Sequence, residues 1–145
     1  MAKINDLIFI DETLSNISAI IDSLPENSEW FQISSLTDGI QQIETITKNY
    51  QNLNSIQIVS HGNSGSLSIG SASLSNQNIT NYQSNFSNIG NSLVKGGDLL
   101  IYACNVASDE DGKKLVTGIA EYTLADVAAS IDLTEEAEGY FPIDA

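Results

Sequence analysis

The sequence has little of what usually marks a chemical function. Its 145 residues contain one cysteine, Cys104, and one histidine, His61. A single cysteine excludes an intrachain disulfide and a zinc site built from cysteines. No apolar run approaches the ~18 residues of a membrane helix, and the run at residues 7–10 is too short for a signal peptide. We therefore expect no membrane insertion and an export signal, if one is used, outside this chain or of another kind.

Basic residues are also scarce. Lysine and arginine together number 5 against 19 acidic residues, which gives a formal net charge of -14 and a pI near 4.1. A surface this acidic repels nucleic-acid phosphates and anionic lipid, so both are excluded as expected partners. Basic peptides and cations such as calcium are compatible with it, although no motif indicates a metal site or a cofactor.

What is present is a regular alternation of apolar strands and amphipathic helices over a single domain, residues 1–145. The hydrophobic content of 41% is sufficient for a core. Strands are predicted at 6–11, 29–34, 55–61, 97–105 and 126–130, with a small hairpin or strand extension within 62–78. Helices are predicted at 12–25, 36–53, 78–94 and 108–125, and the tail 133–145 is predicted to be a loop. Thr13 is the expected cap of the first helix and Thr37 or Asp38 that of the second.

This alternation predicts an α/β fold: an open, mainly parallel sheet with helices on both faces. Functional sites in such sheets collect at the carboxyl ends of the strands, near the point where strand order reverses. His61 closes the third predicted strand and Cys104 the fourth. Consecutive strands of this kind are often neighbours ~4.8 Å apart, so the imidazole and the thiol are predicted to approach each other.

A histidine beside a cysteine suits nucleophilic catalysis, because the imidazole can accept the thiol proton. The helix expected to begin near Ser108 directs its positive end toward the loop that carries Cys104. The backbone N–H groups of Gly62 and Cys104 are candidate donors to a developing oxyanion. Asn105 is a candidate for orienting the loop or the imidazole, with a plain turn role as the alternative.

These residues carry a family resemblance. The pieces "IVSHG" and "LLIYAC" resemble the caspase-like cysteine peptidases, which include caspases, gingipains, clostripain, separase and the self-cleaving domains of large toxins. Nearly the whole chain, most strongly residues 55–134, is similar to a bacterial domain of unknown function. That domain usually lies near the N-terminus of large surface or secreted proteins with cadherin-like or calcium-binding repeats. The resemblance implies a three-layer, caspase-like sheet with flavodoxin-like winding, His61 as base and Cys104 as nucleophile.

The sequence departs from that family at a helix end, where "TLADVAAS" places Leu124 at a position expected to hold glycine. Glycine at a helix end normally supplies a positive φ. The departure therefore concerns a turn and not the His61–Cys104 pair.

Other acidic residues have weaker claims. Asp11, at the end of the first predicted strand, is a candidate pocket or orienting residue. It begins "DETLS", which loosely resembles the metal-binding pattern of von Willebrand A-type domains, but Thr13 capping a helix explains the same residues. The triplet at 109–111 fits a solvated first helical turn better than a calcium site. Asp132 is a candidate pocket residue for a basic side chain from its position alone. A response regulator would need an aspartate where this chain has His61.

The expected function is a caspase-like cysteine endopeptidase or self-processing domain, acting on a peptide or protein that includes its own parent chain. The acidic surface favours a basic residue before the cleaved bond. The alternative is a catalytically idle module of the same fold, used for binding, adhesion or extracellular assembly, in which self-association is open. The resemblance implies an extracellular or cell-surface location.

Overall fold

Two sheets form the molecule. The computed structural model describes residues 3–15, 17–103, 105–130 and 140–143. The larger sheet has six strands in the order β2-β1-β3-β7-β8-β9, and the smaller has three in the order β4-β5-β6. The large-sheet strands are β1 (Asp6–Asp11), β2 (Ser28–Ile33), β3 (Leu53–Val59), β7 (Leu93–Tyr102), β8 (Asp126–Ser130) and β9 (Tyr140–Ile143). The small-sheet strands are β4 (His61–Asn63), β5 (Ser66–Ile69) and β6 (Ala72–Ser75), and the helices are α1 (Ile17–Asp22), α2 (Gly39–Thr47), the 3-10 turn η1 (Ile79–Tyr82), α3 (Gln83–Gly90) and α4 (Glu110–Thr123).

The large sheet is mainly parallel, as predicted. β1 pairs in parallel with β2 on one side and β3 on the other, and β3, β7 and β8 continue the parallel run. Strand order therefore reverses at β1. The loop prediction for 133–145 is wrong at Tyr140–Ile143, because β9 pairs antiparallel with β8. A strand there satisfies backbone N–H and C=O groups that β8 would otherwise present at an open edge.

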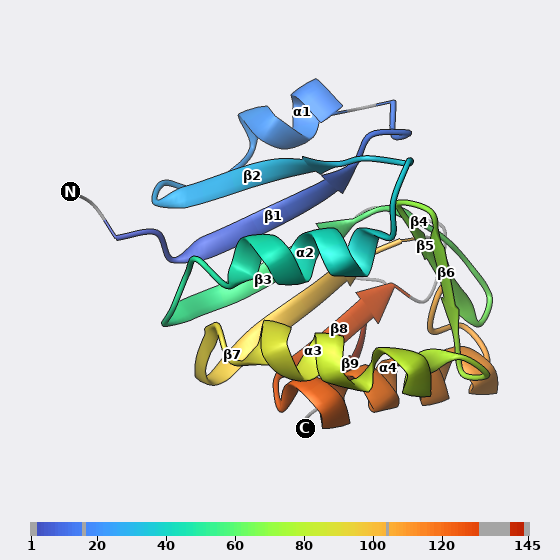
Figure 1. Ribbon diagram of the computed structural model, residues 1–145. Coiled ribbons are helices and arrows are strands. Elements are labelled where there is room, and N and C mark those ends of the chain that lie inside the picture. Colours follow the sequence, from blue (N-terminus) through green and yellow to red (C-terminus); the bar gives the residue numbers. More distant parts are fainter. Residues whose placement is uncertain (1–2, 16, 104, 131–139, 144–145) are drawn as a thin grey trace.

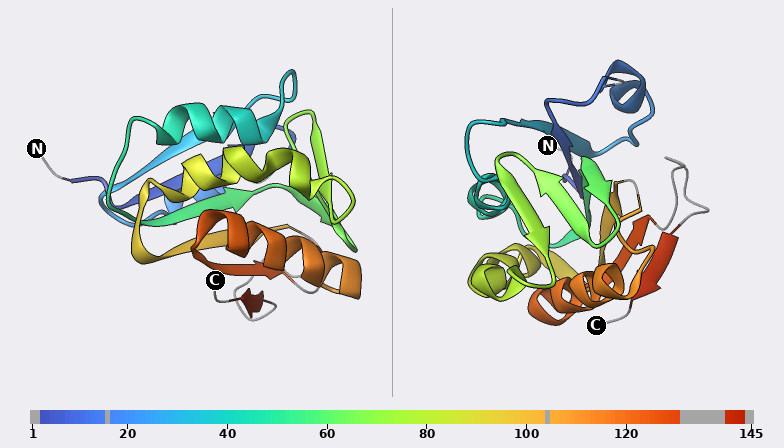
Figure 2. Two further views of the ribbon diagram at one scale, coloured as in Figure 1. Left: turned by 60° about the horizontal axis from the view of Figure 1, so that its bottom comes forward. Right: turned by 90° about the vertical axis from the view of Figure 1, so that its right-hand side faces the viewer.

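Helices cover both faces of the large sheet. Figure 1 shows α2, α3 and α4 side by side on one face, and the right-hand view of Figure 2 places α1 on the opposite face. The three-layer α/β architecture is confirmed. The two faces are unequally covered, since the second carries one helix of six residues with no buried side chain.

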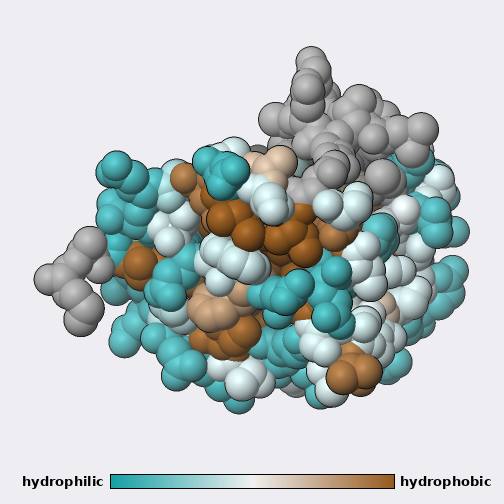
Figure 3. Space-filling view, turned by 90° about the horizontal axis from the view of Figure 1, so that it is seen from above, coloured by the Kyte–Doolittle hydropathy of each residue, from teal (hydrophilic) through white to brown (hydrophobic). Residues whose placement is uncertain are grey.

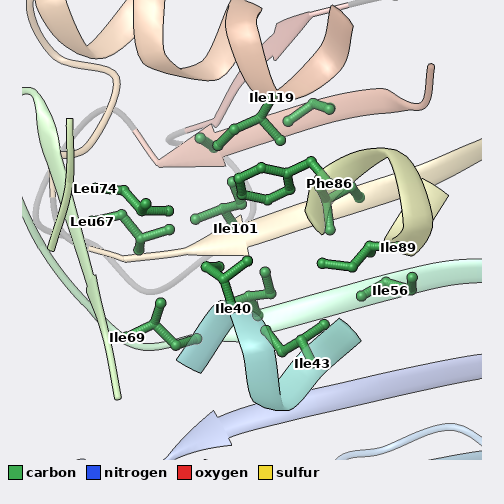
Figure 4. Packing of buried hydrophobic residues seen from close by; sticks show 14 of the residues in the cluster. Ile40, Ile43, Ile56, Leu67, Ile69, Leu74, Phe86, Ile89, Ile101 and Ile119 are labelled. Atoms are coloured by element: carbon green, nitrogen blue, oxygen red, sulfur yellow. The ribbon is translucent and has the colours of Figure 1, made fainter. Parts of the chain in front are cut away.

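The apolar core lies between the sheet and the three-helix layer. Figure 4 shows side chains from α2, α3 and α4 meeting those of the central strands and of the small sheet, all of them buried. Ile40 and Ile43 enter from α2, and Leu67 and Leu74 enter from the small sheet. Burying side chains of this size stabilises the fold by about 1.5–3 kcal/mol each. The small sheet therefore packs against the main core through buried side chains.

All four predicted helices are shorter than expected. The second, predicted over 36–53, is Gly39–Thr47, and the fourth, predicted over 108–125, is Glu110–Thr123. The other two show a physical reason. The first was predicted from residue 12, but α1 begins at Ile17, because Thr13 and Leu14 form a turn against Asp11. The helix predicted at 78–94 comprises η1 and α3 and stops at Gly90, and Leu93 already pairs with Leu53 of β3. A local turn therefore delays the start of the first helix, and pairing with β3 follows the end of the other.

The second predicted helix start is confirmed. Asp38 caps α2 by accepting hydrogen bonds from the backbone N–H groups of Ile40 and Gln41, at 2.8 and 3.2 Å. The predicted hairpin within 62–78 is also confirmed and gains a third strand, β6. Among the described residues, no helix is long and apolar enough to cross a bilayer.

The unusual residue at the end of α4 adopts the backbone conformation that glycine would favour. Leu124 has φ 60° and ψ 24°, and its side chain is 78% exposed. A left-handed conformation costs a non-glycine residue about 1–2 kcal/mol. Replacing leucine by glycine would remove this cost but would also add backbone entropy to the unfolded chain, which offsets part of the gain. The leucine makes little compensating contact.

We expect Leu124→Gly to raise the free energy of unfolding by about 0.5–1 kcal/mol, measured by urea denaturation. Leu36→Gly is the control, because Leu36 is 87% exposed and is not a positive-φ residue. That control should be neutral or slightly destabilising. A loss of stability in Leu124→Gly would contradict the assignment of strain to this residue.

Candidate active site

The candidate residues lie where the central strands end. β3 and β7 are hydrogen-bonded neighbours with Val59 opposite Tyr102, and no strand lies between them. Their pairing extends one step further, because the Ser60 N–H donates to the Tyr102 carbonyl at 3.1 Å. His61 is the second residue after Val59, and Cys104 is the second after Tyr102. Cys104 itself, like Asp132, lies outside the described residues.

His61 was predicted to end the third strand, but β3 ends at Val59 and His61 is the first residue of β4. The chain leaves β3 at Ser60, whose hydroxyl donates to the Ser68 carbonyl and also lies 3.4 Å from a carboxylate oxygen of Asp11. β4 then pairs antiparallel with β5, which places His61 opposite Ser68 and Gly62 opposite Leu67. The His61 side chain is exposed. The imidazole is thus carried by a hairpin that stands on the carboxyl edge of the sheet.

Asp11 is the buried anchor of this edge. It is 3% exposed and accepts hydrogen bonds from the Thr13 N–H at 2.9 Å, the Thr13 hydroxyl at 2.5 Å and the Gly70 N–H at 2.9 Å. The predicted role of Thr13 as a helix cap is therefore wrong. Burial alone would raise the pKa of Asp11, but the hydrogen bonds from Thr13 and Gly70 and the charge of His61 together lower it. Asp11 thereby ties β1 to the hairpin of His61.

The loop after Cys104 contains a hydrogen-bonded turn. Asn105 has φ 57°, and its carbonyl accepts hydrogen bonds from the Ser108 N–H at 3.2 Å and the Ser108 hydroxyl at 2.9 Å. Asp109 caps α4 by accepting from the Gly112 N–H at 2.8 Å. The backbone of Asn105 therefore forms the turn, and Asp109 is the N-cap of α4. Among the described residues, no group of three or more His, Cys, Asp or Glu side chains could hold a metal.

The two loops are joined to each other. The Gly65 N–H donates to the Val106 carbonyl at 3.2 Å, and the Ser64 and Ser108 hydroxyls are 2.9 Å apart. Gly65 has φ 82°, as expected of a turn glycine. These contacts fix the hairpin of His61 against the segment that follows Cys104. The sequence offered no signal for them beyond the glycine.

A cavity of about 490 Å³ opens beside the strand ends, on the α1 face of the sheet. His61 and Ala103 both line it, together with residues from α1 and its flanks and from β1, β3 and β7. Figure 3 views the molecule from the α1 side and shows apolar residues gathered near the centre of that surface. Sequence reasoning missed this cavity because its walls come from segments far apart in the chain.

The comparison with protein families finds a match. The sequence model of a family described as "Domain of unknown function (DUF4347)" matches residues 7–139. The match spans the central strands, the hairpin and the loop that precedes α4. No curated protein matches the chain.

Two glycines of α4 form a test of how the loop is held. A Cβ atom at Gly112 would lie 1.8 Å from the Val106 carbonyl oxygen, whereas one at Gly118 would meet only Ile79, at 3.6 Å. We expect Gly112→Ala to lower the free energy of unfolding by about 2 kcal/mol or more through overpacking. Gly118→Ala should be neutral or stabilising by up to about 1 kcal/mol, since alanine favours helix. Equal effects of the two substitutions in urea denaturation would contradict the close packing of this loop.

Asp11 gives a prediction with a defined pH dependence. Asp11→Asn should lower the free energy of unfolding at pH 7 by about 2 kcal/mol, because an amide cannot accept all the donors that face the carboxylate. The folded-state pKa lies below the ordinary value of 3.8, so the carboxylate's contribution is complete above that value and is lost as the pH falls through the folded-state pKa. The difference between the two proteins should therefore narrow from pH 5 to pH 3.

The control is Asp22→Asn on the exposed side of α1, which should change stability by no more than about 0.5 kcal/mol at any of these pH values. A gap between Asp11→Asn and the unsubstituted protein that widens on acidification would refute the assigned role of Asp11.

Proposed function

The chain belongs to this family of domains of unknown function, and we propose that it is a caspase-like cysteine endopeptidase or self-processing domain with Cys104 as nucleophile and His61 as base. The observation that carries the proposal is the in-register pairing of β3 and β7, with Val59 opposite Tyr102. β3 and β7 end side by side. His61 is the second residue after Val59, and Cys104 is the second residue after Tyr102.

The chemistry follows from the two side chains. His61 accepts the proton of the Cys104 thiol, and the thiolate attacks a peptide carbonyl to form a tetrahedral oxyanion. Collapse of this intermediate breaks the C–N bond, and the imidazolium gives its proton to the leaving amine. Water, deprotonated by the imidazole, then attacks the thioester and releases the acid, which restores the thiol.

The backbone supplies the remaining stabilisation in this proposal. Gly62 lacks a side chain that would obstruct a substrate near its N–H, and this amide and that of Cys104 are the proposed oxyanion donors. The N-terminus of α4, a helix of 14 residues, follows the cysteine loop closely and favours the thiolate. The ties of Gly65 to Val106 and of Ser64 to Ser108 support a fixed geometry before substrate binds.

The setting of the activity is part of the proposal. The substrate is a peptide or protein, with the parent chain as one candidate, and no cofactor is required. The resemblance to a domain of large bacterial surface and secreted proteins favours an extracellular or cell-surface location. A domain that is catalytically idle and serves adhesion, self-association or assembly is the outcome that the experiments must separate from it.

Thiol alkylation tests the pair directly. Iodoacetamide should label Cys104 at pH 6.5–7 through an imidazole-assisted thiolate, and His61→Ala should slow labelling by about 10²-fold or more. The rate in the variant should recover as the pH rises past about 8.5, where an ordinary thiol ionises. Asn63→Ala, on the same exposed strand β4, is the matched control and should label like the unsubstituted protein.

Mass spectrometry of the purified chain, and of a longer parent chain, tests the peptidase activity itself. Cleavage should be present in the unsubstituted protein and absent in Cys104→Ala. Equal labelling rates in the unsubstituted protein and His61→Ala, together with no cysteine-dependent cleavage, would leave the idle module as the function of this fold.

A further inference from the structure

We propose that the cavity beside His61 binds a large, uncharged apolar side chain of the substrate, on the residue next to the bond that is cleaved. This inference rests on the proposed function for its chemistry, but the cavity is an independent feature of the described residues. It names a substrate class different from the one that the acidic surface favours.

The location of the cavity relates it to the reaction. His61 lines its mouth, and so does Ala103, the residue before the proposed nucleophile. Val59 and Tyr102, the last paired residues of β3 and β7, also line it. A peptide whose carbonyl lies between the two loops would therefore have this cavity within reach of the adjoining side chain.

The described residues that line the cavity are apolar or polar without a carboxylate or an amine. Their apolar surface comes from β1, from the α1 segment and from the strand ends, and consists of Ile8, Leu14, Ile20, Leu24, Pro25, Val59, Tyr102 and Ala103. The polar lining consists of hydroxyl groups, the amide of Gln57 and the imidazole of His61. Among the residues that the structure describes, no aspartate, glutamate or lysine lines the cavity. Burial raises the pKa of the Tyr102 phenol, so this wall stays neutral.

Charge decides which side chain such a cavity accepts. A lysine or arginine of the substrate would lose hydration there. It would find no carboxylate to pair with on the described wall, because the nearby acid Asp11 is buried and held by Thr13 and Gly70. An aspartate of the substrate would find one basic group, His61, among the described lining residues. A leucine, methionine or phenylalanine side chain loses nothing by leaving water and gains the apolar contact. The net charge of -14 therefore attracts basic peptides to the surface without selecting a basic residue for this cavity.

Size supports the same class. A volume of about 490 Å³ falls within the range of roughly 300–1,000 Å³ that ligand pockets have. A small side chain would leave much of the apolar wall in contact with water, whereas a large one covers it. His61, which lines the cavity, has an exposed side chain, so the cavity reaches the surface.

The first arm of the experiment measures binding without reaction. The ¹⁵N-labelled full chain carrying Cys104→Ser is titrated with the N-acetyl N-methylamides of leucine, phenylalanine, lysine and aspartate. The leucine and phenylalanine probes should shift the amide signals of Val59, His61 and Ala103, with dissociation constants at least tenfold lower than those of the charged probes. Equal or tighter lysine binding, or shifts confined to other residues, would overturn the inference. So would shifts of these amides with protein concentration alone, because a second copy would then fill the cavity.

A matched pair of substitutions tests the charge argument. Gln57→Glu places a carboxylate in the cavity at nearly constant volume, and Gln32→Glu adds the same charge on exposed β2, outside the cavity. The first should tighten the lysine probe relative to the leucine probe by about tenfold or more, and the second should not. If Gln57→Glu fails to fold, Leu14→Gln in the loop before α1 should weaken the leucine and phenylalanine probes alone. An unchanged preference in whichever of these variants folds would refute the assignment.

The second arm separates the inference from the proposed function. Peptide acyloxymethyl ketones with leucine, lysine or aspartate next to the reactive group are applied to the unsubstituted chain. Leucine-selective labelling of Cys104 supports both claims, and lysine-selective labelling overturns the inference while supporting the peptidase. Leucine-selective binding in the first arm without any labelling refutes the peptidase and leaves a neutral, apolar binding site.

Discussion

The parallel pairing of β3 with β7 is the constraint on which the rest of this molecule depends. It places Val59 opposite Tyr102. The Ser60 N–H donates to the Tyr102 carbonyl and so extends the pairing to the point where the two strands diverge. Because hydrogen bonds between strands fix register, a shift by one residue would also turn the following side chains to the opposite face. The site is therefore specified by a buried, cooperative part of the fold and not by its loops.

The loops are then attached to that frame by a small set of polar contacts. Asp11 holds the hairpin through the Gly70 N–H, and the Gly65 N–H holds the segment after Cys104 through the Val106 carbonyl. A buried carboxylate is costly unless it is satisfied, and Asp11 is satisfied by several donors from different segments. The same contacts that remove this cost also position the hairpin, so stability and site geometry are linked here.

The two faces of the sheet have different roles as a result of their helices. Three helices and the small sheet bury one face in a continuous apolar core (Figure 4). The short helix α1 covers the other face less completely and leaves the cavity beside His61. The strongly acidic surface and the neutral cavity are consequently separate properties: one sets the long-range field, and the other sets local contacts.

The sequence alone determined the alternation of strands and helices, the mainly parallel sheet with helices on both faces, and a helix cap at Thr37 or Asp38. It also marked Leu124 as a residue at a turn where glycine is expected. The structure selects Asp38 as the cap and gives Leu124 a positive φ. The predicted features depend on periodicity and on the chemistry of neighbouring residues, which a linear pattern records. It also singled out His61 and Gly62 at a strand end. Tertiary structure alone decided that His61 opens a separate hairpin, that Asp11 anchors it, that α1 is short and that β9 closes the edge of β8. The anchoring of the hairpin by Asp11 depends on a hydrogen bond to Gly70, 59 residues away, and no local pattern encodes such a contact. The hairpin, the short α1 and the pairing of β9 depend on nearer contacts that the periodicity of apolar residues does not record.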